Sequence, residues 1–514
     1  MFDYKYNSFY EVLKEHAKKS PKATAYYVGD RKISFERMLL KVDTFARFLE
    51  LIGVHRGDKV ALYLANSIEF IVALLAAQKL GAIPVPVNNF LKEEEVVFIL
   101  NDSEAKILVA SADFSKELQN IFSRTGVQKI IWEGEYNGLD ENNISFNEIL
   151  SNLESHEKIT QSVDIDDIAV IIYTSGTTGK PKGAMLSYRN IFSNILGIEQ
   201  LLHIKPKERF IVYLPMFHSF TLTVTILMPL YFGSPVVIIR SIMPFSNIIK
   251  QVLLKRVSVF VGVPDVYNAL SKAKLPWYFH WFNSVKYYVS GAAALPEDTL
   301  KRFRKRFKKG VLLEGYGLSE ASPVVAVNLP NKQKPKSVGP AIPGVTVKIV
   351  DEDMVELPLG EIGEIIVKGD NVMQGYWKRP EATAETIVNG WLRTGDLGYM
   401  DEDGFIFIVD RKKDLIISKG INIYPREIEE VLTSHPLVKA AAVIGIKDEK
   451  SGEVPVAYIE SEDGEQISES EIKKYLREHL ANYKIPKSIF IVDELPKNAT
   501  GKVLKRVLKE RLSQ

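Results

Sequence analysis

The feature that most restricts the fold of this 514-residue chain is an alternation of strand and helix patterns near its beginning. Residues 60–64 form an apolar run that is typical of a strand buried on both faces, and residues 83–87 form a second one. Between them, residues 70–80 have the length and pattern of a helix that ends at a glycine. A strand–helix–strand unit of this spacing implies a right-handed crossover in a mainly parallel sheet. Strand patterns at 106–110 and 236–239 continue the rhythm, so most of the chain is expected to be α/β.

The pattern changes after residue 330, and the chain is longer than one hydrophobic core usually allows. Short strand patterns separated by turn residues occur at 345–350, 363–368 and 404–409 and predict an antiparallel or mixed β subdomain. Helix, strand and helix patterns then follow at 425–432, 438–444 and 468–480. We therefore expect an α/β fold with a large N-terminal domain of α/β sheet layers plus a β subdomain, residues 1–410. A small mobile α+β C-terminal domain, residues 411–514, is expected to follow.

A long uncharged stretch could be mistaken for a membrane span, because no Asp, Glu, Lys or Arg lies between Arg209 and Arg240. Pro215, Pro229 and Pro235 interrupt it, and several hydroxyl side chains make it partly polar. A buried strand–loop–helix of a large core fits this pattern better. With no basic, apolar leader pattern at its beginning, the chain is expected to be cytoplasmic; peripheral contact with a membrane is left open.

Charge and cysteine content exclude several classes of function. The 66 basic and 64 acidic residues nearly cancel to a net charge of +2, so no nucleic-acid partner is expected. The basic run at 301–306 is interpreted as a solvated helix face. Because the chain has no cysteine, it has no disulfide, cysteine-ligated zinc or cysteine nucleophile, and any reacting thiol must come from outside.

A loop rich in glycine, hydroxyl and lysine residues follows the strand pattern at 168–173. Its glycines let the backbone approach a ligand closely, and its hydroxyls and lysines suit an anion such as a triphosphate. A kinase-type phosphate loop is excluded by spacing, since only two residues separate its first glycine from the Gly-Lys pair. An ordinary flexible loop would leave the lysines unexplained. The candidate phosphate-binding residues are Thr174, Ser175, Gly176, Thr177, Thr178, Gly179, Lys180 and Lys182.

This loop resembles the signature of the adenylate-forming superfamily, which comprises acyl- and aryl-CoA synthetases, peptide-synthetase adenylation domains and beetle luciferases. Further motifs of the family occur in order along nearly the whole chain. The resemblance implies that the segment with Gly291, Ala292 and Ala293 runs beside adenine, and that Tyr316 stacks on the base. It also implies that Glu314, Gly315 and Gly317 belong to the nucleotide site, that Ser319 binds the α-phosphate and that Glu320 helps to hold Mg²⁺.

The resemblance assigns the remaining nucleotide contacts to later motifs. Asp396 would bind both ribose hydroxyls, with Arg411 beside it, although Asp410 stands where the family commonly has glycine. Lys502, in Pro496–Lys502, would bridge the carboxylate and the α-phosphate and so stabilise charge that develops during adenylation, an effect worth roughly 10²–10³-fold in rate.

Two half-reactions require two arrangements of the small domain, because Lys502 must leave before a thiol can approach. Lys413 matches the position of the family's hinge residue. The segment with Lys419 and Gly420 would then line the tunnel for the pantetheine arm of CoA.

The acid is expected to be a medium- or long-chain fatty acid. His218 and Ser219 stand where amino-acid-activating domains carry an Asp, so an amino acid is disfavoured, and His218 is counted among the catalytic residues. Gly317 stands where acetate-specific relatives carry Trp, which predicts an open pocket. The apolar residues 220–230 could line an alkyl tunnel or simply pack in the core.

The expected activity is therefore an ATP-dependent acid–thiol ligase that uses ATP, Mg²⁺ and CoA, with a fatty acid and CoA as small-molecule substrates. A cinnamate-like aryl acid, and acyl carrier protein as acceptor, remain alternatives. Oxidation of the adenylate as in luciferase, adenylate formation without thiol transfer, and a non-enzymatic nucleotide sensor are disfavoured by Lys413, Gly420, Lys502 and Glu320. A homodimer is left open.

Overall fold

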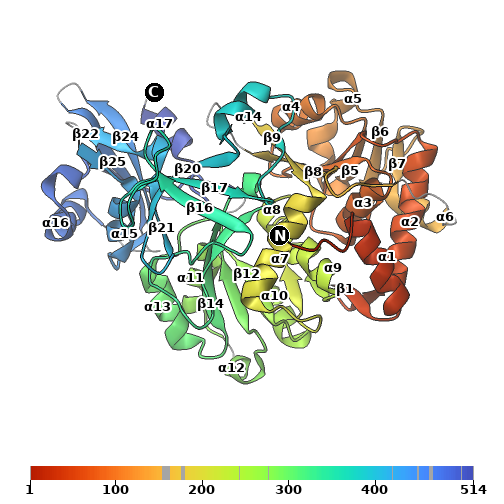
Figure 1. The fold of residues 1–514 in the computed structure, drawn as a ribbon, viewed down its shortest axis with the longest axis horizontal. Helices are drawn as coiled ribbons and strands as arrows, with labels where there is room; N and C mark the ends of the chain where they lie inside the picture. Colours follow the sequence, from red (N-terminus) through yellow and green to blue (C-terminus); the bar gives the residue numbers. More distant parts are fainter. Residues whose placement is uncertain are drawn as a thin grey trace.

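The structure is a computed structural model that describes residues 2–152, 162–174, 180–241, 243–275, 277–418, 421–448, 451–461, 467–498 and 501–512. Figure 1 shows a large body that carries the N-terminal and central parts of the chain and a smaller C-terminal part, in blue, at its left end. This arrangement confirms the expected α/β fold class with a large N-terminal and a small C-terminal unit.

The first sheet contains the predicted strand–helix–strand unit. Its order is β4-β3-β5-β6-β7, and every pair in it is parallel. The strands are β3 (Lys59–Tyr63), β4 (Ile83–Pro86), β5 (Ile107–Ser111), β6 (Lys129–Glu133) and β7 (Asn143–Ser145). The helices of this region are α1 (Phe9–Lys19), α2 (Phe35–Leu51), α3 (Ile68–Lys79), α4 (Glu93–Ser103), α5 (Ile121–Arg124) and α6 (Phe146–Asn152). The crossover α3 is buried along nearly its whole length, because α2 covers the side that faces away from the sheet.

A second, eight-stranded sheet occupies the centre of the molecule, with the order β15-β14-β13-β12-β10-β11-β1-β2. Its strands are β1 (Thr24–Val28), β2 (Arg31–Ser34), β10 (Phe210–Val212), β11 (Val236–Ile238), β12 (Val259–Gly262), β13 (Tyr287–Ser290), β14 (Val311–Gly317) and β15 (Val324–Val327). The six inner strands pair in parallel, and only the edge strands β2 and β15 are antiparallel. The helices α10 (Phe245–Leu254), α11 (Pro264–Lys272) and α13 (Glu297–Arg306) connect these parallel strands.

The uncharged stretch between Arg209 and Arg240 lies in the core, as predicted. It forms β10, a helical segment and β11, and the helical segment comprises α8 (Ser219–Thr221), a π-helix (Leu222–Leu227) and α9 (Met228–Phe232). Most of its side chains are buried, and Thr225 satisfies its hydroxyl group by donating to the carbonyl of Thr221 at 2.7 Å. None of the helices in the part of the chain that the structure describes has the length and apolarity that crossing a bilayer requires.

Antiparallel strands form the predicted β subdomain. One sheet has the order β16-β17-β20-β19, with β21 also paired to β20, and a three-stranded sheet has the order β18-β9-β8. The bounds are β8 (Ile168–Thr174), β9 (Lys182–Ser187), β16 (Val345–Val350), β17 (Gly363–Gly369), β18 (Gly375–Tyr376), β19 (Ile387–Val388), β20 (Trp391–Met400) and β21 (Ile406–Arg411). The strand expected from residue 404 begins at Ile406, because Gly404 has a φ of +76° and its N–H closes a turn onto the carbonyl of Asp401.

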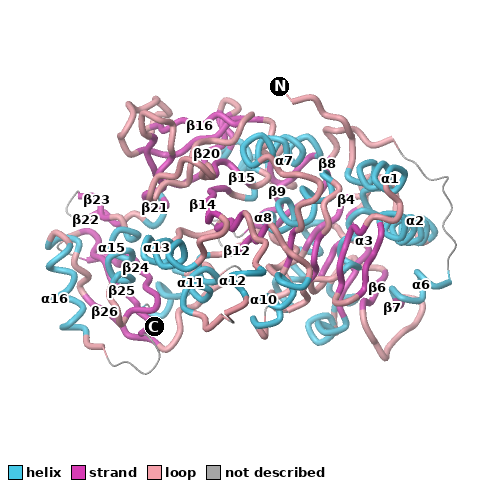
Figure 2. Tube along the Cα trace, turned by 90° about the horizontal axis from the view of Figure 1, so that it is seen from below, coloured by secondary structure: helices cyan, strands magenta, loops and turns pink. Residues whose placement is uncertain are grey.

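The C-terminal part has its own sheet and its own core. The strands are β22 (Ile416–Ser418), β23 (Ile421–Ile423), β24 (Val438–Asp448), β25 (Gly452–Ser461) and β26 (Ser488–Val492), and the helices are α15 (Pro425–Ser434), α16 (Glu469–His479) and α17 (Lys505–Leu512). Ile428 and Leu432 of α15 pack against Val443 and Ile459 of the sheet. The chain passes from the β21 sheet to the β22 sheet between Arg411 and Ile416. Figure 2 shows this part as a compact unit beside α13.

Candidate active site

The candidate site residues gather at the carboxyl ends of the parallel central strands. Gly262 of β12 is level with Ser290 of β13, and Ser290 is level with Glu314 of β14. The predicted adenine segments that follow Ser290 and include Glu314 are therefore neighbours in space. The segment that contains His218 follows β10 at the same edge. The edge at the carboxyl ends of parallel strands is where α/β sheets commonly bind ligands.

The backbone of the first adenine segment, residues 291–293, leaves room only for small side chains. A Cβ atom on Gly291 would approach the ring of Phe220 to 2.8 Å, so glycine is required for close packing. Ala292, which follows it, has a φ of +68°, in the left-handed region that residues other than glycine rarely adopt. Ala292 and Ala293 are both exposed. The segment thus presents two small side chains and open backbone, on which a flat base can lie.

Tyr316 and Asp396 form the centre of the predicted base and ribose site. The Tyr316 hydroxyl donates to the Asp396 carboxylate at 2.7 Å. Burial of its ring, assisted by the Asp396 charge, raises the pKa of Tyr316, so the hydroxyl remains a donor. Arg411 lies opposite Asp396 across the β20–β21 pair, and its Nε is 3.3 Å from the carboxylate. The structure therefore places Tyr316, Asp396 and Arg411 together.

Glu314 lies beside this group and faces the C-terminal part. Burial raises the pKa of Glu314 to about 7, opposed by the positive charges of Arg426 and Arg304. The next residue, Gly315, has room for a Cβ, whose nearest neighbour would be the Ala326 carbonyl at 3.4 Å. Gly317 has no room for a Cβ, because the added atom would lie 2.0 Å from the carbonyl oxygen of Pro323. The backbone of the β14–β15 turn thus requires glycine at 317, a reason separate from the open acyl pocket expected from the sequence.

Glu320 has two hydrogen-bond donors on different strands. Its Oε1 accepts from the hydroxyl of Thr174 at 3.2 Å and from the hydroxyl of Tyr376 at 2.9 Å. The ammonium of Lys182 lies over the Tyr376 ring, 5.2 Å from its centroid, and Lys180 is exposed near the ring of Phe98. Sequence analysis missed Tyr376; its pairing with β9 in the three-stranded sheet is a tertiary contact that no local pattern indicates.

The Glu320 carboxylate fits a magnesium ion that shares its ligands with a triphosphate. Carboxylate oxygen is a ligand that Mg²⁺ prefers, and one or two protein carboxylates are usual when phosphates supply further oxygens. No group of three or more His, Cys, Asp or Glu side chains suited to a metal occurs among the described residues. Protein ligands alone therefore do not form a cage here, and an ion at Glu320 depends on nucleotide oxygens.

Two serines connect the acyl motif with the predicted α-phosphate motif. The hydroxyl of Ser219, which is buried, lies 2.8 Å from the hydroxyl of Ser319. His218 precedes Ser219, and its Nδ1 accepts from the backbone N–H of Phe220 at 3.3 Å, capping α8. Burial, with a smaller contribution from the Lys502 charge, lowers the pKa of His218 to about 4. The imidazole is therefore neutral at physiological pH and acts as a hydrogen-bonding group rather than as a cation.

Lys502 reaches this site from the C-terminal part. Its backbone N–H donates to the Asn498 side chain at 2.9 Å, within a tight turn. Burial, then the positive charge of Arg411, lowers the pKa of Lys502 to about 8, while Asp396 opposes the shift. The Lys502 side chain is thus within electrostatic range of Arg411 and Asp396, and its charge in turn acts on His218. The structure thus brings Lys502 to the same place as the ribose, α-phosphate and acyl motifs.

Contacts between the two parts hold Lys502 in this position. Lys497 Nζ is 3.7 Å from Asp265 Oδ2 at the start of α11, and Gly501 also lies next to Asp265. Arg426 of α15 donates to the carbonyl of Ile408 at 2.8 Å. Asp410 joins the parts as well, because its carboxylate accepts from the backbone N–H groups of Arg411 at 2.7 Å and Arg426 at 2.8 Å. The aspartate that departs from the family pattern therefore has a clear local role at the start of α15.

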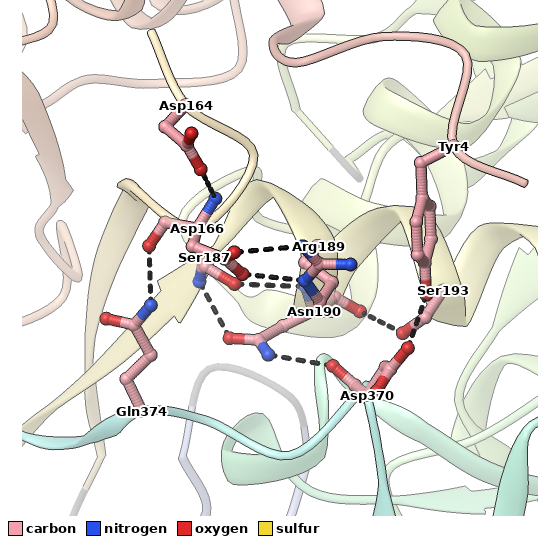
Figure 3. Close-up of polar contacts among 9 residues, drawn as sticks. All are labelled: Tyr4, Asp164, Asp166, Ser187, Arg189, Asn190, Ser193, Asp370 and Gln374. Atoms are coloured by element: carbon pink, nitrogen blue, oxygen red, sulfur yellow. Dashed lines mark hydrogen bonds and ion pairs between the residues drawn. The ribbon is translucent and has the colours of Figure 1, made fainter. Parts of the chain in front are cut away.

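The hairpin that carries the phosphate-binding loop is braced on its far side (Figure 3). Both oxygens of Asp166, just before β8, pair with Arg189 at the start of α7 (Tyr188–Leu202), at 2.6 and 2.8 Å. Gln374, just before β18, donates to the Asp166 carbonyl at 2.6 Å, and Asn190 donates to the Asp370 carbonyl at 2.7 Å. This network ties the ends of the β8–β9 hairpin to the segment that carries Tyr376.

Some predicted residues cannot be placed. Ser175, Gly176, Thr177, Thr178 and Gly179 of the phosphate-binding loop lie outside the described residues, as do Lys419 and Gly420 of the expected pantetheine tunnel. Lys413, the expected hinge residue, is exposed in a 3₁₀ turn (Lys412–Asp414) between β21 and β22. The roles assigned to these residues by the resemblance remain predictions.

Comparison with known proteins finds relatives over nearly the whole chain. The profile of a family described as AMP-binding enzyme matches residues 13–377, and that of the AMP-binding enzyme C-terminal domain matches residues 427–502. A long-chain-fatty-acid–CoA ligase of Escherichia coli is 32% identical, with 98% of this chain and 95% of that protein covered. A feruloyl-CoA synthase of an Amycolatopsis species is 34% identical, with 96% and 97% covered.

Among solved structures, ATP-bound MatB from Rhodopseudomonas palustris superimposes with a TM-score of 0.89 at 31% identity, covering 98% of this chain and 99% of that one. The apo structure of the same protein gives a TM-score of 0.78 at the same identity, with 99% of both chains covered. Because the two structures have one sequence, the difference reflects conformation. The arrangement seen here resembles the ATP-bound structure more than the apo structure.

Proposed function

The chain belongs to the AMP-binding enzyme family, and on that premise we propose that it is an AMP-forming acid–thiol ligase that converts a medium- or long-chain fatty acid to its CoA thioester. The observation that carries the proposal is the convergence of four separate segments at one sheet edge. Tyr316 with Asp396, Ser219 with Ser319, Glu320 and Lys502 supply groups suited to a nucleoside, an α-phosphate, a magnesium ion and a reacting carboxylate.

In the proposed first half-reaction a carboxylate oxygen of the acid attacks the α-phosphorus of ATP. The bond from the α-phosphorus to the bridging oxygen breaks, and pyrophosphate leaves. Negative charge on the α-phosphate oxygens is met by the Lys502 ammonium and by the hydroxyl of Ser319, which Ser219 orients at 2.8 Å. Mg²⁺ bound at Glu320 would supply further positive charge to the phosphate oxygens. Tyr316 and Asp396 hold the nucleoside so that the α-phosphorus stays in line with the attacking oxygen.

In the proposed second half-reaction the CoA thiol loses its proton, its sulfur attacks the acyl carbon, and AMP leaves. Lys502 occupies the site in the arrangement seen here, so the C-terminal part must move before the thiol can approach. The higher TM-score against the ATP-bound relative than against its apo form supports more than one arrangement in proteins of this kind. Lys413 lies in the short turn between the two parts, where a small backbone change would produce a large movement.

The proposed choice of a fatty acid rests on the acyl side of the site. Phe217, just before His218, and Leu222 and Leu227, after it, are buried apolar residues. The ring of Phe220 packs against Gly291. The neutral His218 offers no fixed charge to a polar or charged acyl group. The E. coli relative, a long-chain-fatty-acid–CoA ligase, supports the same choice.

An aryl acid is the second candidate, because the feruloyl-CoA synthase relative is 34% identical with 96% of this chain covered. Aromatic side chains near the acyl motif, such as Phe217 and Phe220, would suit an aromatic ring as well as an alkyl chain.

The two candidates are separated by measuring AMP release from ATP and Mg²⁺ with acetate, octanoate, palmitate and ferulate, each with and without CoA. We expect AMP and acyl-CoA to form together with octanoate or palmitate, and at a much higher kcat/KM than with ferulate. A preference for ferulate would refute the fatty-acid proposal and leave the ligase proposal intact. If pyrophosphate is released but adding CoA does not increase turnover, another thiol is the acceptor.

A further inference from the structure

A group of exposed aromatic side chains surrounds the short helix α12 (Phe279–Phe282). Trp277, Tyr278, Trp281 and Phe282, here called the aromatic patch, expose 78%, 43%, 75% and 67% of their surface. Figure 1 shows α12 at the lower edge of the molecule, away from the C-terminal part. Four large exposed aromatic residues within six positions form a concentration of apolar surface that usually marks an interaction site.

The aromatic patch is held in place by the core beneath it. Phe279 is buried between the exposed residues, and its ring packs edge-on against Phe307 at 6.0 Å. The ammonium of Lys309 donates to the Trp281 carbonyl at 3.3 Å, and Arg306 donates to the Ser271 carbonyl at 3.0 Å. The fold therefore presents these rings to solvent from an anchored segment, although burying them in the core would be the ordinary outcome for aromatic residues.

Basic residues predominate in the sequence around the aromatic patch, with Glu297 and Asp298 as the acidic exceptions. No Asp or Glu occurs at residues 266–296 or 299–313. The second stretch holds seven basic residues: Lys301, Arg302, Arg304, Lys305, Arg306, Lys308 and Lys309. As expected for a solvated face, most of these on α13 are exposed while Phe303 is buried. Lys272, Lys274, Lys308 and Lys309, here called the basic rim, are exposed. The first two precede the aromatic patch in sequence, Lys309 contacts it and Lys308 adjoins Lys309.

We propose that the aromatic patch and the basic rim dock the protein on the surface of an anionic lipid bilayer. Trp and Tyr are favoured at the level of lipid headgroups, because their rings are apolar and each carries a polar group. Lysines beside them are attracted to the negative surface of anionic lipids. A second copy of this chain fits poorly, since two such surfaces would bring like charges together. The proposal does not depend on which acid the enzyme activates.

Vesicle co-sedimentation of the full chain tests the proposal. We expect binding to vesicles of phosphatidylcholine with phosphatidylglycerol and much weaker binding to phosphatidylcholine alone. Changing Trp277→Ser, Trp281→Ser and Phe282→Ser together should weaken binding at least tenfold. Neutralising Lys274→Gln and Lys308→Gln should weaken it roughly 25-fold at low salt, since each lysine near such a surface contributes about a factor of five. In the wild type, the emission of the two exposed tryptophans of the five in the chain should shift to the blue on binding.

The control variants remove similar side chains from surfaces away from the aromatic patch. Leu51→Ser with Leu359→Ser removes exposed apolar side chains elsewhere, and Lys22→Gln with Lys32→Gln removes the same charge elsewhere; both should bind vesicles nearly as the wild type does. Because the altered aromatic residues are exposed, every variant should keep the melting temperature and ligase activity of the wild type. Wild-type protein that does not bind anionic vesicles, or an aromatic-patch variant that binds them equally well, overturns the proposal. Self-association that the aromatic-patch variant abolishes, without vesicle binding, would show instead that the patch joins two copies.

Discussion

The hydroxyl of Tyr316 donates a hydrogen bond of 2.7 Å to the carboxylate of Asp396, although 80 residues separate the two in the chain. Tyr316 lies on β14 of the central sheet, and Asp396 lies on β20 of the antiparallel subdomain. The bond therefore joins two sheets at the point where the nucleoside is proposed to bind. It also leaves Asp396 with a neutral donor on one side and the Arg411 guanidinium on the other.

Removing this hydroxyl should weaken ATP binding more than it slows chemistry. We expect Tyr316→Phe to raise the KM for ATP about tenfold with little change in kcat, because a hydrogen bond to a charged group is lost while the ring remains. Steady-state kinetics with varied ATP measure this. Tyr213→Phe is the matched control, since the buried Tyr213 hydroxyl has no hydrogen-bond partner among the described residues. Equal effects of the two substitutions would contradict the role given to Tyr316.

Lys502→Ala should separate the two half-reactions. Pyrophosphate formation from ATP and acid should fall at least about 10²–10³-fold, because a preorganised positive charge is removed from the site. Thioester formation from chemically supplied acyl-adenylate should remain within a few-fold of the wild type. The control is Lys474→Ala, which removes an exposed lysine of α16 in the same part of the chain. Equal loss of both half-reactions in Lys502→Ala would refute the assignment of Lys502 to adenylation alone.

The pH dependence of adenylation should report the ionisation of Lys502. Its pKa is lowered to about 8, so in the free enzyme the ammonium form dominates at pH 7 and is lost as pH rises through 8. Since the positive form is the active one, kcat/KM for adenylate formation should decline above pH 8. Stopped-flow or isotope-exchange rates between pH 6 and 10 test this. Lys502→Arg, whose guanidinium stays charged, should show no such decline in whatever activity it retains; a decline at the same pH would assign the ionisation to another group.

The contact between Lys497 and Asp265 should favour the arrangement that forms the adenylate. Asp265→Lys replaces a 3.7 Å ion pair with two like charges where the C-terminal part meets α11. Because Asp265 is largely exposed, we expect only a two- to fivefold loss in adenylation rate, with no loss of thioester formation from supplied adenylate. Asp265→Asn removes the pair without adding a like charge and should cost less than Asp265→Lys, because Lys497 keeps its 3.3 Å contact with Glu460. An adenylation rate of Asp265→Lys equal to that of the wild type would show that the pair does not hold the arrangement.

Gly317 should be required for stability, whatever the acid. Gly317→Ala places a Cβ 2.0 Å from the Pro323 carbonyl oxygen and should cost about 1–3 kcal/mol in the free energy of unfolding. Gly315→Ala, two residues earlier, meets nothing closer than 3.4 Å and should be tolerated far better. Thermal and denaturant unfolding of the two variants test the difference. If Gly317→Ala is as stable as the wild type, the open acyl pocket is the only remaining reason for a glycine at this position.

Much of the fold could be predicted because its signals are local. The strand expected at 345–350 is β16, and the helix expected at 425–432 begins α15. Strand ends were less predictable: β21 starts two residues late because Gly404 belongs to a turn.

The site was only partly predictable. Motifs identify Tyr316, Asp396, Glu320 and Lys502 one by one, but they do not say which of them touch. The contacts of Tyr376 with Glu320, and of Ser219 with Ser319, join strands and turns that are far apart in sequence. Asp410 appeared only as a departure from the family pattern, and its bonds to the start of α15 explain it.

The sequence by itself determined the α/β class, the order of the motifs and the chemistry of each motif, because apolar periodicity, glycine and proline positions and side-chain type are properties of short segments. Only the tertiary structure decided that the charges of Lys502 and Asp396 act on one another, that Gly317 has no room for a side chain and that Trp277 and Trp281 face solvent. These relationships depend on strand register and on the packing of one part of the chain against another. No short segment contains that information, since each distance is set by all the elements between the two residues.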